Sequence, residues 1–445
     1  MEQREEGFQA RFYRLERQSK AESLGFRRKL KVVVWVGVAG IVAYFLVPFA
    51  ALGSPFSTER SVLTNQAITH AKLVSSSDLL VNANGTATFR AQDITPTKFS
   101  DVFDVPYLSD KLGVPLLEWH ELKHTSDSST GGSPLVTEQL GCWSTSAGND
   151  AWGGSRGQPT ESYSARLYGL DISYTPVPSS STLTHGADSR TTVWSIWALA
   201  MLGYPKTRAK ALPDQLALTF PLHDGSGKKL LPDDHMLCFD LLYYTGVVQP
   251  IPTNDFFADY SPFWNQVGIH MRWKSSLVNI ATQYLRRHFG VNARDPIPPF
   301  IAVHVRRADF RETCPSGINK DDCFAPMSAY HRRVQEVKER LRNRPNEVNV
   351  RAVLVTSDEH DAAWWDQVAA LGPEWRWIDH KAEQTDEKYG NWFALLLDTV
   401  FQSMGAGFVG TARSTMSDIA QKRVEDWNGG ETATVRWGTP GADDH

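Results

Sequence analysis

The most regular pattern of hydrophobic and polar positions lies between residues 300 and 427. Short apolar runs of strand length alternate there with longer segments whose apolar residues recur at helical spacing. The pattern predicts strands at 300–305, 352–358, 375–379 and 407–411, and helices at 327–344, 359–372, 391–405 and 414–427. Short buried strands that alternate with helices indicate right-handed βαβ crossovers. The chain is therefore predicted to have an α/β fold with a parallel, Rossmann-like sheet covered on both faces.

The region before this pattern, residues 96–295, alternates less regularly. It predicts strands at 114–119 and 166–174 and helices at 191–202 and 276–289, with loose polar loops between them. Three prolines at 296, 298 and 299 mark a boundary, because proline ends helices and favours extended structure in the residue before it. We therefore expect one lobe at 96–295 and a second at 296–445.

A long apolar run without charges, residues 32–52, dominates the N-terminal part of the chain. It is long enough to span a bilayer as a helix, and it follows a basic cluster made of Arg27, Arg28, Lys29 and Lys31. By the positive-inside rule, residues 1–31 are predicted to form a cytosolic tail and the body to lie in the lumen. The alternative is a cleaved signal peptide. Residues 53–95 are polar and rich in Ser, Thr and Asn, which is typical of a stem, so we expect a single-pass type II membrane protein of the Golgi or endoplasmic reticulum.

Composition adds two limits to this picture. The 445 residues include 46 Lys and Arg against 50 Asp and Glu, which gives a net charge of −4. A near-neutral chain has no global electrostatic attraction to nucleic acid, so we expect no nucleic-acid partner. Hydrophobic residues make up 41% of the chain, which excludes a mostly disordered protein.

Two further features fit a lumenal body. Asn84 begins an Asn-Gly-Thr glycosylation acceptor. The four cysteines allow three pairings; Cys314 and Cys323 flank a short polar loop and are predicted to pair, which leaves Cys142 with Cys238 if those two are close. The alternative is four buried thiols. No Cys-x-x-Cys spacing or neighbouring histidine cluster suggests zinc.

Candidate chemistry lies first at the end of the strand at 300–305. Side chains alternate along a strand, so His304 and Arg306 share one face while Val303 and Val305 share the other. Ligands of parallel sheets bind at the carboxyl ends of the strands, and an arginine fork matches phosphate oxygens. The alternative is an Arg306–Asp309 ion pair that only closes the loop.

A second candidate lies where the strand at 407–411 meets the next helix. Ser414, Thr415 and Ser417 place hydroxyls beside the free N–H groups at the positive end of that helix, which suits an anion. The alternative is ordinary helix capping. Together the two junctions could hold a diphosphate. The sequence contains no P-loop and no D-x-D motif, so a metal-dependent site of the last kind is not expected.

Three segments, IPPFIAVHVRRADF (297–310), VTSDEHDAAWW (355–365) and LLLDTVFQSMGAGFVGTARSTMSDIAQKRVEDWNGG (395–430), resemble the GDP-fucose protein O-fucosyltransferase family, in a divergent branch common in fungi. A weaker match extends over 98–119 and 233–244. The resemblance implies a two-lobed GT-B glycosyltransferase that needs no metal or other cofactor and takes GDP-fucose as its donor in the C-terminal lobe. It implies that Arg306 stabilises the leaving β-phosphate and that His304 lines the same pocket.

The resemblance also assigns the remaining site residues. Ser414 and Thr415 would hold the phosphates, Asp398 would hydrogen-bond the guanine, and Arg307 and Asp309 would support the site. Members of the family carry a Gly/Asn/Gln-rich turn near the start of the first lobe. In the stretch before Lys98, only Thr64-Asn65-Gln66 weakly matches this turn.

The expected function is inverting transfer of fucose to a hydroxyl of a protein Ser/Thr or a glycan. The candidates for the general base are Asp104, Glu118 and His120. One alternative is a catalytically degenerate, membrane-anchored protein that binds a nucleotide sugar or a protein partner. Another is a transferase that uses a different nucleotide sugar.

Overall fold

The structure is a computed structural model. It describes residues 80–81, 87–88, 98–117, 138–146, 158–159, 170–184, 193–242, 245–246, 261–390 and 392–444. The predicted membrane span at 32–52, the acceptor Asn84 and the base candidates Glu118 and His120 lie outside these residues. Within the described ranges, no helix combines the length and the apolar character that crossing a bilayer requires.

The chain divides into two compact units. The first comprises Met1–Thr69 and Thr95–Arg272, and the second comprises His70–Ile94 and Trp273–His445. The division therefore precedes helix α9 (Ser275–Phe289), which belongs to the second unit. The three prolines at 296–299 do not separate the units but lead from α9 into the first strand of the large sheet.

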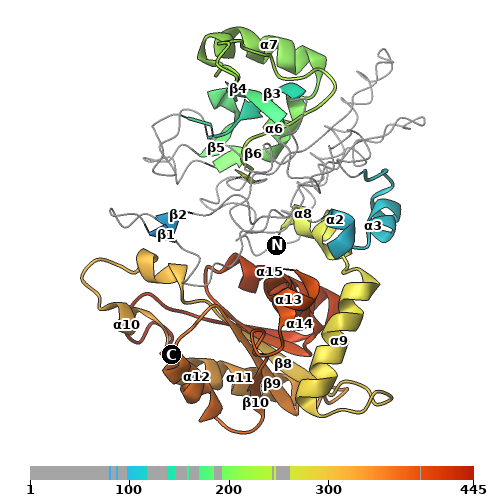
Figure 1. Ribbon diagram of the computed structural model, residues 1–445, viewed down its shortest axis with the longest axis vertical. Coiled ribbons are helices and arrows are strands. Elements are labelled where there is room, and N and C mark those ends of the chain that lie inside the picture. The colour runs from blue at the N-terminus through green and yellow to red at the C-terminus, as the bar shows by residue number, and fades with distance from the viewer. Residues whose placement is uncertain are drawn as a thin grey trace, which may run out of the picture. The chain divides into compact units, whose positions relative to one another are not determined.

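The second unit is built on a five-stranded sheet in the order β10-β9-β8-β11-β12, and every neighbouring pair is parallel. Figure 1 shows this sheet with its helices. The strands are β8 (Phe300–Val305), β9 (Ala352–Ser357), β10 (Trp375–Trp377), β11 (Gly407–Thr411) and β12 (Glu431–Val435). The predicted α/β fold with a parallel sheet is confirmed.

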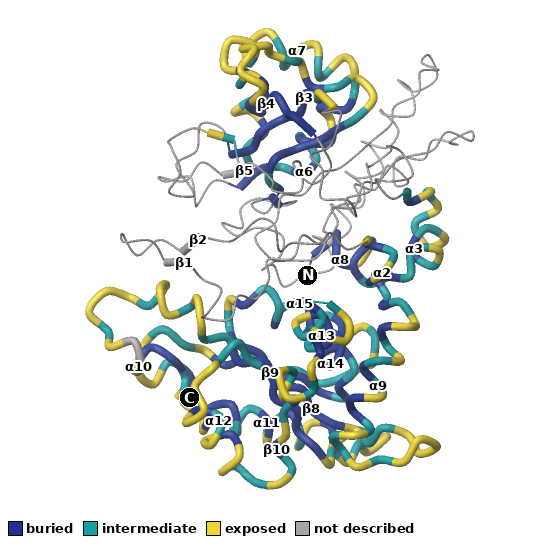
Figure 2. The backbone as a smooth tube through the Cα atoms, in the orientation of Figure 1, coloured by how far each residue is buried: buried dark blue, intermediate teal, exposed yellow. Residues whose placement is uncertain are grey.

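Helices cover both faces of this sheet. On one face, Ile301, Val303 and Val305 of β8 share a buried cluster with α11 and α12. On the other face, His304 bonds Ser417 of α15, and Gln402 of α14 donates to Thr356 of β9. The predicted alternation of His304 against Val303 and Val305 is therefore confirmed, and Figure 2 shows the sheet buried between its helices. The other elements of this unit are β1 (Leu80–Val81), β2 (Ala87–Thr88), η9 (Asp309–Thr313), α10 (Lys320–Cys323), α11 (Met327–Arg342), α12 (Ala362–Ala369), α13 (Thr385–Tyr389), α14 (Phe393–Met404) and α15 (Thr415–Asn428).

The first unit consists of short elements around two buried clusters. Strands β3 and β4 pair in parallel, and Cys142 of β3 forms a disulfide with Cys238 inside one cluster. The elements are α2 (Phe99–Val102), α3 (Val105–Leu112), β3 (Glu138–Ser144), β4 (Leu170–Pro176), η4 (Ser179–Ser181), β5 (Thr182–Thr184), β6 (Val193–Ser195), α6 (Ile196–Met201), α7 (Pro205–Gln215), η6 (Leu216–Leu218), β7 (Thr245–Gly246), α8 (Pro262–Gln266) and η8 (Gly268–His270).

Three elements differ from the sequence-based prediction. The helix predicted at 191–202 is a strand, β6, followed by the short helix α6, because Ser195 caps α6 by accepting a hydrogen bond from Ala198 N–H. Residues 114–117 form no strand. The predicted unit ends at 427, whereas the sheet continues into β12, whose Thr-rich sequence carries no apolar run.

Candidate functional site

The order in which the chain adds strands to the large sheet reverses between β8 and β11. From β8 the chain moves through β9 to β10 on one side, and it then returns to build β11 and β12 on the other side. In open α/β sheets, ligands bind beyond the carboxyl ends of the strands at such a switch point. Gly410 of β11 pairs with His304 of β8. The two junctions singled out in the sequence therefore lie next to each other at this switch point.

A buried hydroxyl joins the two strand ends. Thr411 Oγ1 accepts a hydrogen bond from Arg306 N–H at 3.0 Å and donates to the His304 carbonyl at 3.0 Å. The hydroxyl of Tyr330 donates to the same oxygen at 2.8 Å. Thr411 is buried, so these three bonds fix the backbone of both junctions to one another.

His304 is buried and serves the contact between strand and helix. Its Nδ1 lies 2.8 Å from Ser417 Oγ, which also accepts a hydrogen bond from Thr411 N–H at 3.0 Å. A Cβ on Gly410 would lie 2.7 Å from Ser417 Cβ, so only glycine permits this approach of α15 to β11. Burial, together with the nearby Arg306 guanidinium, lowers the pKa of His304 from 6.5 to about 3. The imidazole is therefore neutral at physiological pH.

Arg306 lies at the mouth of the switch point with its charge shared between two carboxylates. Nε lies 2.8 Å from Asp309 Oδ1 and Nη1 lies 2.9 Å from Asp358 Oδ2. The ion pair with Asp309 that the sequence left open is present, but Asp309 is 65% exposed and well hydrated. The Arg306 side chain is itself 27% exposed, so its guanidinium can be reached by a ligand.

Asp358, which the sequence analysis did not select, organises the loop after β8. Its Oδ1 accepts hydrogen bonds from Arg307 N–H at 2.8 Å and Ala308 N–H at 3.2 Å. Its Oδ2 is buried and faces Arg306 without hydrogen-bond geometry. Asp358 could have been selected from the sequence, because it directly follows the buried strand β9. The strands of a parallel sheet end at the same edge, so this carboxylate would be expected near the end of β8.

Arg307 turns away from Arg306 and supports the loop. Its Nε pairs with Glu359 Oε2 at 2.7 Å, and its guanidinium lies 4.4 Å from the centroid of the Phe324 ring. Burial raises the pKa of Glu359, but the hydrogen bonds from Arg307 and two backbone N–H groups outweigh it and lower the pKa overall. The guanidinium of Arg307 is thus committed to contacts within the protein.

Two hydroxyls at the start of α15, those of Ser414 and Thr415, make no hydrogen bond to another described residue. Ser414 is the N-cap residue and is 4% exposed, yet its side chain makes no capping hydrogen bond. The first-turn N–H groups of a helix also lack intrahelical acceptors, and the helix dipole adds partial positive charge. This end of α15 is therefore suited to bind an anion.

Asp398 lies on α14, one turn before Gln402. Since Gln402 contacts Thr356 near the carboxyl end of β9, Asp398 lies farther toward the same edge of the sheet. Its Oδ1 is 3.0 Å from His380 Nε2, while His380 Nδ1 bonds Thr385. Burial disfavours the charged imidazole, but Asp398 and two nearby aspartates outweigh this and raise the pKa of His380. None of these interactions links Asp398 to the other predicted site residues.

The base candidate Asp104 has a structural role in this fold. Its carboxylate accepts a hydrogen bond from Tyr107 N–H at 3.0 Å and caps helix α3. Among the residues that the structure describes, no group of three or more His, Cys, Asp or Glu side chains is arranged to hold a metal ion.

No protein-family model and no curated protein matches this sequence. Among solved structures, the chain is similar to the apo form of POFUT1, with 15% identity, a TM-score of 0.42, and coverage of 80% of this chain and 87% of that one. POFUT1 in complex with GDP-fucose gives 14% identity and a TM-score of 0.41, over 79% and 87% of the two chains. The fucosyltransferase NodZ from Bradyrhizobium gives 16% identity and a TM-score of 0.25, over 42% and 50%.

Proposed function

We propose that the chain is a membrane-anchored lumenal glycosyltransferase of GT-B architecture that transfers fucose from GDP-fucose to a hydroxyl acceptor. The observation that carries the proposal is that the loop after β8 and the start of α15 meet at the switch point of a parallel sheet. Arg306 supplies a partly exposed guanidinium on one side, and Ser414 and Thr415 supply unengaged hydroxyls on the other. The segments that hold these residues are the ones that resemble the O-fucosyltransferase family.

In the proposed reaction, an acceptor oxygen attacks the anomeric carbon of fucose from the face opposite the diphosphate. The bond from that carbon to the β-phosphate oxygen breaks, and GDP leaves with the electron pair. Arg306 and the start of α15 stabilise the charge that develops on GDP. Fixed donors of this kind each contribute on the order of 3–4 kcal/mol. A base must accept the acceptor proton, and the capping role of Asp104 does not favour that residue.

Titration calorimetry with GDP, GDP-fucose and UDP-sugars tests the donor. We expect GDP and GDP-fucose to bind. Binding should persist when EDTA removes metal ions, because only protein groups contact the diphosphate in the proposed site. Tighter binding of a UDP-sugar would redirect the proposal to another donor. Absence of all nucleotide binding would refute it.

Slow release of free fucose from GDP-fucose without acceptor separates an active transferase from a degenerate one. An active site should catalyse this hydrolysis at a rate that falls in the Arg306→Lys variant. Binding without any hydrolysis would favour the degenerate, nucleotide-sugar-binding alternative.

Membrane anchoring through residues 32–52 is tested with sealed microsomes. Added protease should remove only the short N-terminal tail and leave the body intact. Digestion of the body with protection of the N-terminus would reverse the proposed topology.

A further inference from the structure

Trp437, which follows β12, contacts both junctions of the candidate site. We propose that it is a positioning residue that holds the Arg306 loop and the start of α15 at the separation that a diphosphate requires. This inference rests on the proposed nucleotide site. It concerns a residue outside the predicted motifs, in the segment that follows the sheet.

On the first side, Trp437 packs against the loop that carries Arg306. Its indole stacks on Phe310 with ring centroids 4.8 Å apart and an interplanar angle of 27°. The Arg306 guanidinium lies 5.9 Å from the centroid of the same Phe310 ring. Trp437 also packs against Phe324, at 6.2 Å between centroids. The loop therefore rests on the indole through an aromatic contact.

On the second side, the indole N–H of Trp437 donates to the Ala412 carbonyl at 2.7 Å. Ala412 and Arg413 form the turn between β11 and the N-cap Ser414, and Arg413 adopts a left-handed backbone with φ 65°. A non-glycine residue in that conformation requires support from its surroundings. The hydrogen bond from Trp437 fixes the carbonyl directly before it.

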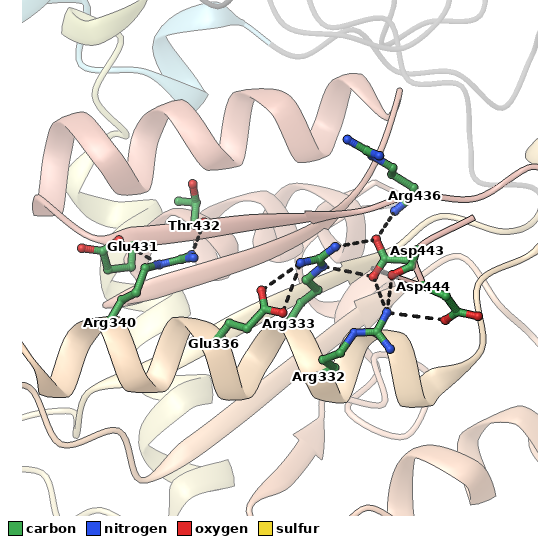
Figure 3. A network of polar contacts seen from close by, with 9 residues as sticks. All are labelled: Arg332, Arg333, Glu336, Arg340, Glu431, Thr432, Arg436, Asp443 and Asp444. Atoms are coloured by element: carbon green, nitrogen blue, oxygen red, sulfur yellow. Dashed lines mark hydrogen bonds and ion pairs between the residues drawn. The ribbon is translucent and has the colours of Figure 1, made fainter. Parts of the chain in front are cut away.

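The segment that carries Trp437 is itself fastened at several points. Asp443 is buried and pairs with Arg332 at 2.9 Å and with Arg333 at 3.0 Å, both on α11, as Figure 3 shows. Asp443 also accepts a hydrogen bond from Arg436 N–H at 2.9 Å. Gly438 N–H donates to the Cys323 carbonyl at 2.8 Å, next to the Cys314–Cys323 disulfide. The residues on both sides of Trp437 are therefore anchored to the body of the unit.

These contacts complement the Thr411 hydroxyl. Thr411 joins the two junctions at the level of the sheet, whereas Trp437 joins them beyond its edge, where the side chains of the site lie. A ligand with two phosphates that bridges both junctions depends on their separation. A ligand with one phosphate depends on it less.

The test compares GDP and GMP binding to the full-length wild type and to Trp437→Phe. The variant keeps an aromatic ring beside Phe310 but cannot donate to Ala412. We expect the dissociation constant for GDP to rise by at most about tenfold, the upper value of one hydrogen bond, while that for GMP changes less. Amide hydrogen exchange without nucleotide should accelerate in both 306–311 and 411–416. Trp437→Ala should raise the dissociation constant for GDP further and accelerate exchange further in both segments.

Trp273→Phe is the control, because Trp273 also donates its indole N–H, to the hydroxyl of Ser403 at 2.8 Å, and this bond involves neither the loop after β8 nor the start of α15. It should leave the ratio of GDP to GMP affinity unchanged. An unchanged ratio in Trp437→Phe, or equal weakening of both nucleotides, would overturn the positioning role while leaving the nucleotide site intact. Failure of the wild type to bind GDP would instead overturn the proposed function and this inference with it.

Discussion

Arg306 is the residue on which the proposed phosphate contact depends most. Arg306→Lys keeps the positive charge beside Asp309 and Asp358 but cannot make a two-pronged contact with phosphate oxygens. We expect GDP binding to weaken by about 1.5–3 kcal/mol, the range for a hydrogen bond to a charged group. The melting temperature without ligand should change little. Calorimetry and thermal unfolding measure the two quantities separately.

The ion pair between Arg306 and Asp309 provides the control for this prediction. If Arg306 only closes the loop, Arg306→Lys and Asp309→Asn should lower the melting temperature alike and leave GDP affinity intact. That result would show the phosphate role to be wrong. The exposure of Asp309 argues for a small effect on stability, because solvated ion pairs contribute little.

The buried, neutral His304 should make stability depend on pH. Its pKa is about 3 in the fold against 6.5 for an ordinary histidine, so between these values the unfolded chain binds a proton that the folded chain does not. Stability from this group is therefore complete above pH 6.5 and is lost as the pH falls toward 3.

His304→Asn removes this titration and keeps a polar atom near Nδ1. The difference in melting temperature between wild type and variant should therefore shrink as the pH falls from 7 to 4. His360→Asn, a change at an exposed side chain, should follow the wild type at every pH. A difference for His304→Asn that stays constant with pH would contradict the assignment.

At the scale of elements, the start of α15 contains one serine that attaches the helix to the sheet and another that is proposed to bind phosphate. Ser417 holds the helix to β11 and β8, whereas the hydroxyl of Ser414 engages no described residue. Ser417→Ala leaves Thr411 N–H and His304 Nδ1 buried without a partner. We expect it to cost about 1–3 kcal/mol in the free energy of unfolding, measured by denaturant titration.

Ser414→Ala is expected to show the converse. Because Ser414 makes no capping hydrogen bond, removing its hydroxyl should change the free energy of unfolding by less than the roughly 1 kcal/mol that loss of an N-cap bond costs. GDP affinity should fall about two- to tenfold, as for the loss of one hydrogen bond. If Ser414→Ala instead destabilised the fold and spared GDP binding, ordinary capping would explain this residue.

At the scale of the whole molecule, each unit contains one disulfide. Cys142–Cys238 spans 96 residues of the first unit, and Cys314–Cys323 spans 9 residues of the second. In the chain-entropy description, removing the first costs about 4–5 kcal/mol and removing the second about 2–3 kcal/mol. Scanning calorimetry of the two double Cys→Ala variants should show the larger loss for Cys142 and Cys238. A larger loss for the short loop would indicate that Cys314–Cys323 stabilises the fold by more than chain entropy.

The sequence by itself determined the parallel α/β unit. The runs at 300–305, 352–358 and 407–411 are buried on both faces of the sheet, so their apolar character is continuous and easily recognised. The same runs located His304, Arg306 and Ser414, because side chains at the carboxyl ends of such strands meet at one edge. The pairing of Cys314 with Cys323 followed from their short separation.

Only the tertiary structure decided which of these side chains bond other parts of the protein and which can still contact a ligand. Asp358 and Thr411 bind Arg306 from distant parts of the chain, and Trp437 bonds the turn before Ser414, so these contacts depend on the packing of the whole unit. β12 was missed because its residues alternate without an apolar run, and it is a strand through its pairing with β11. Local patterns record burial and backbone preference, whereas partners distant in sequence are chosen by the packing of the whole unit.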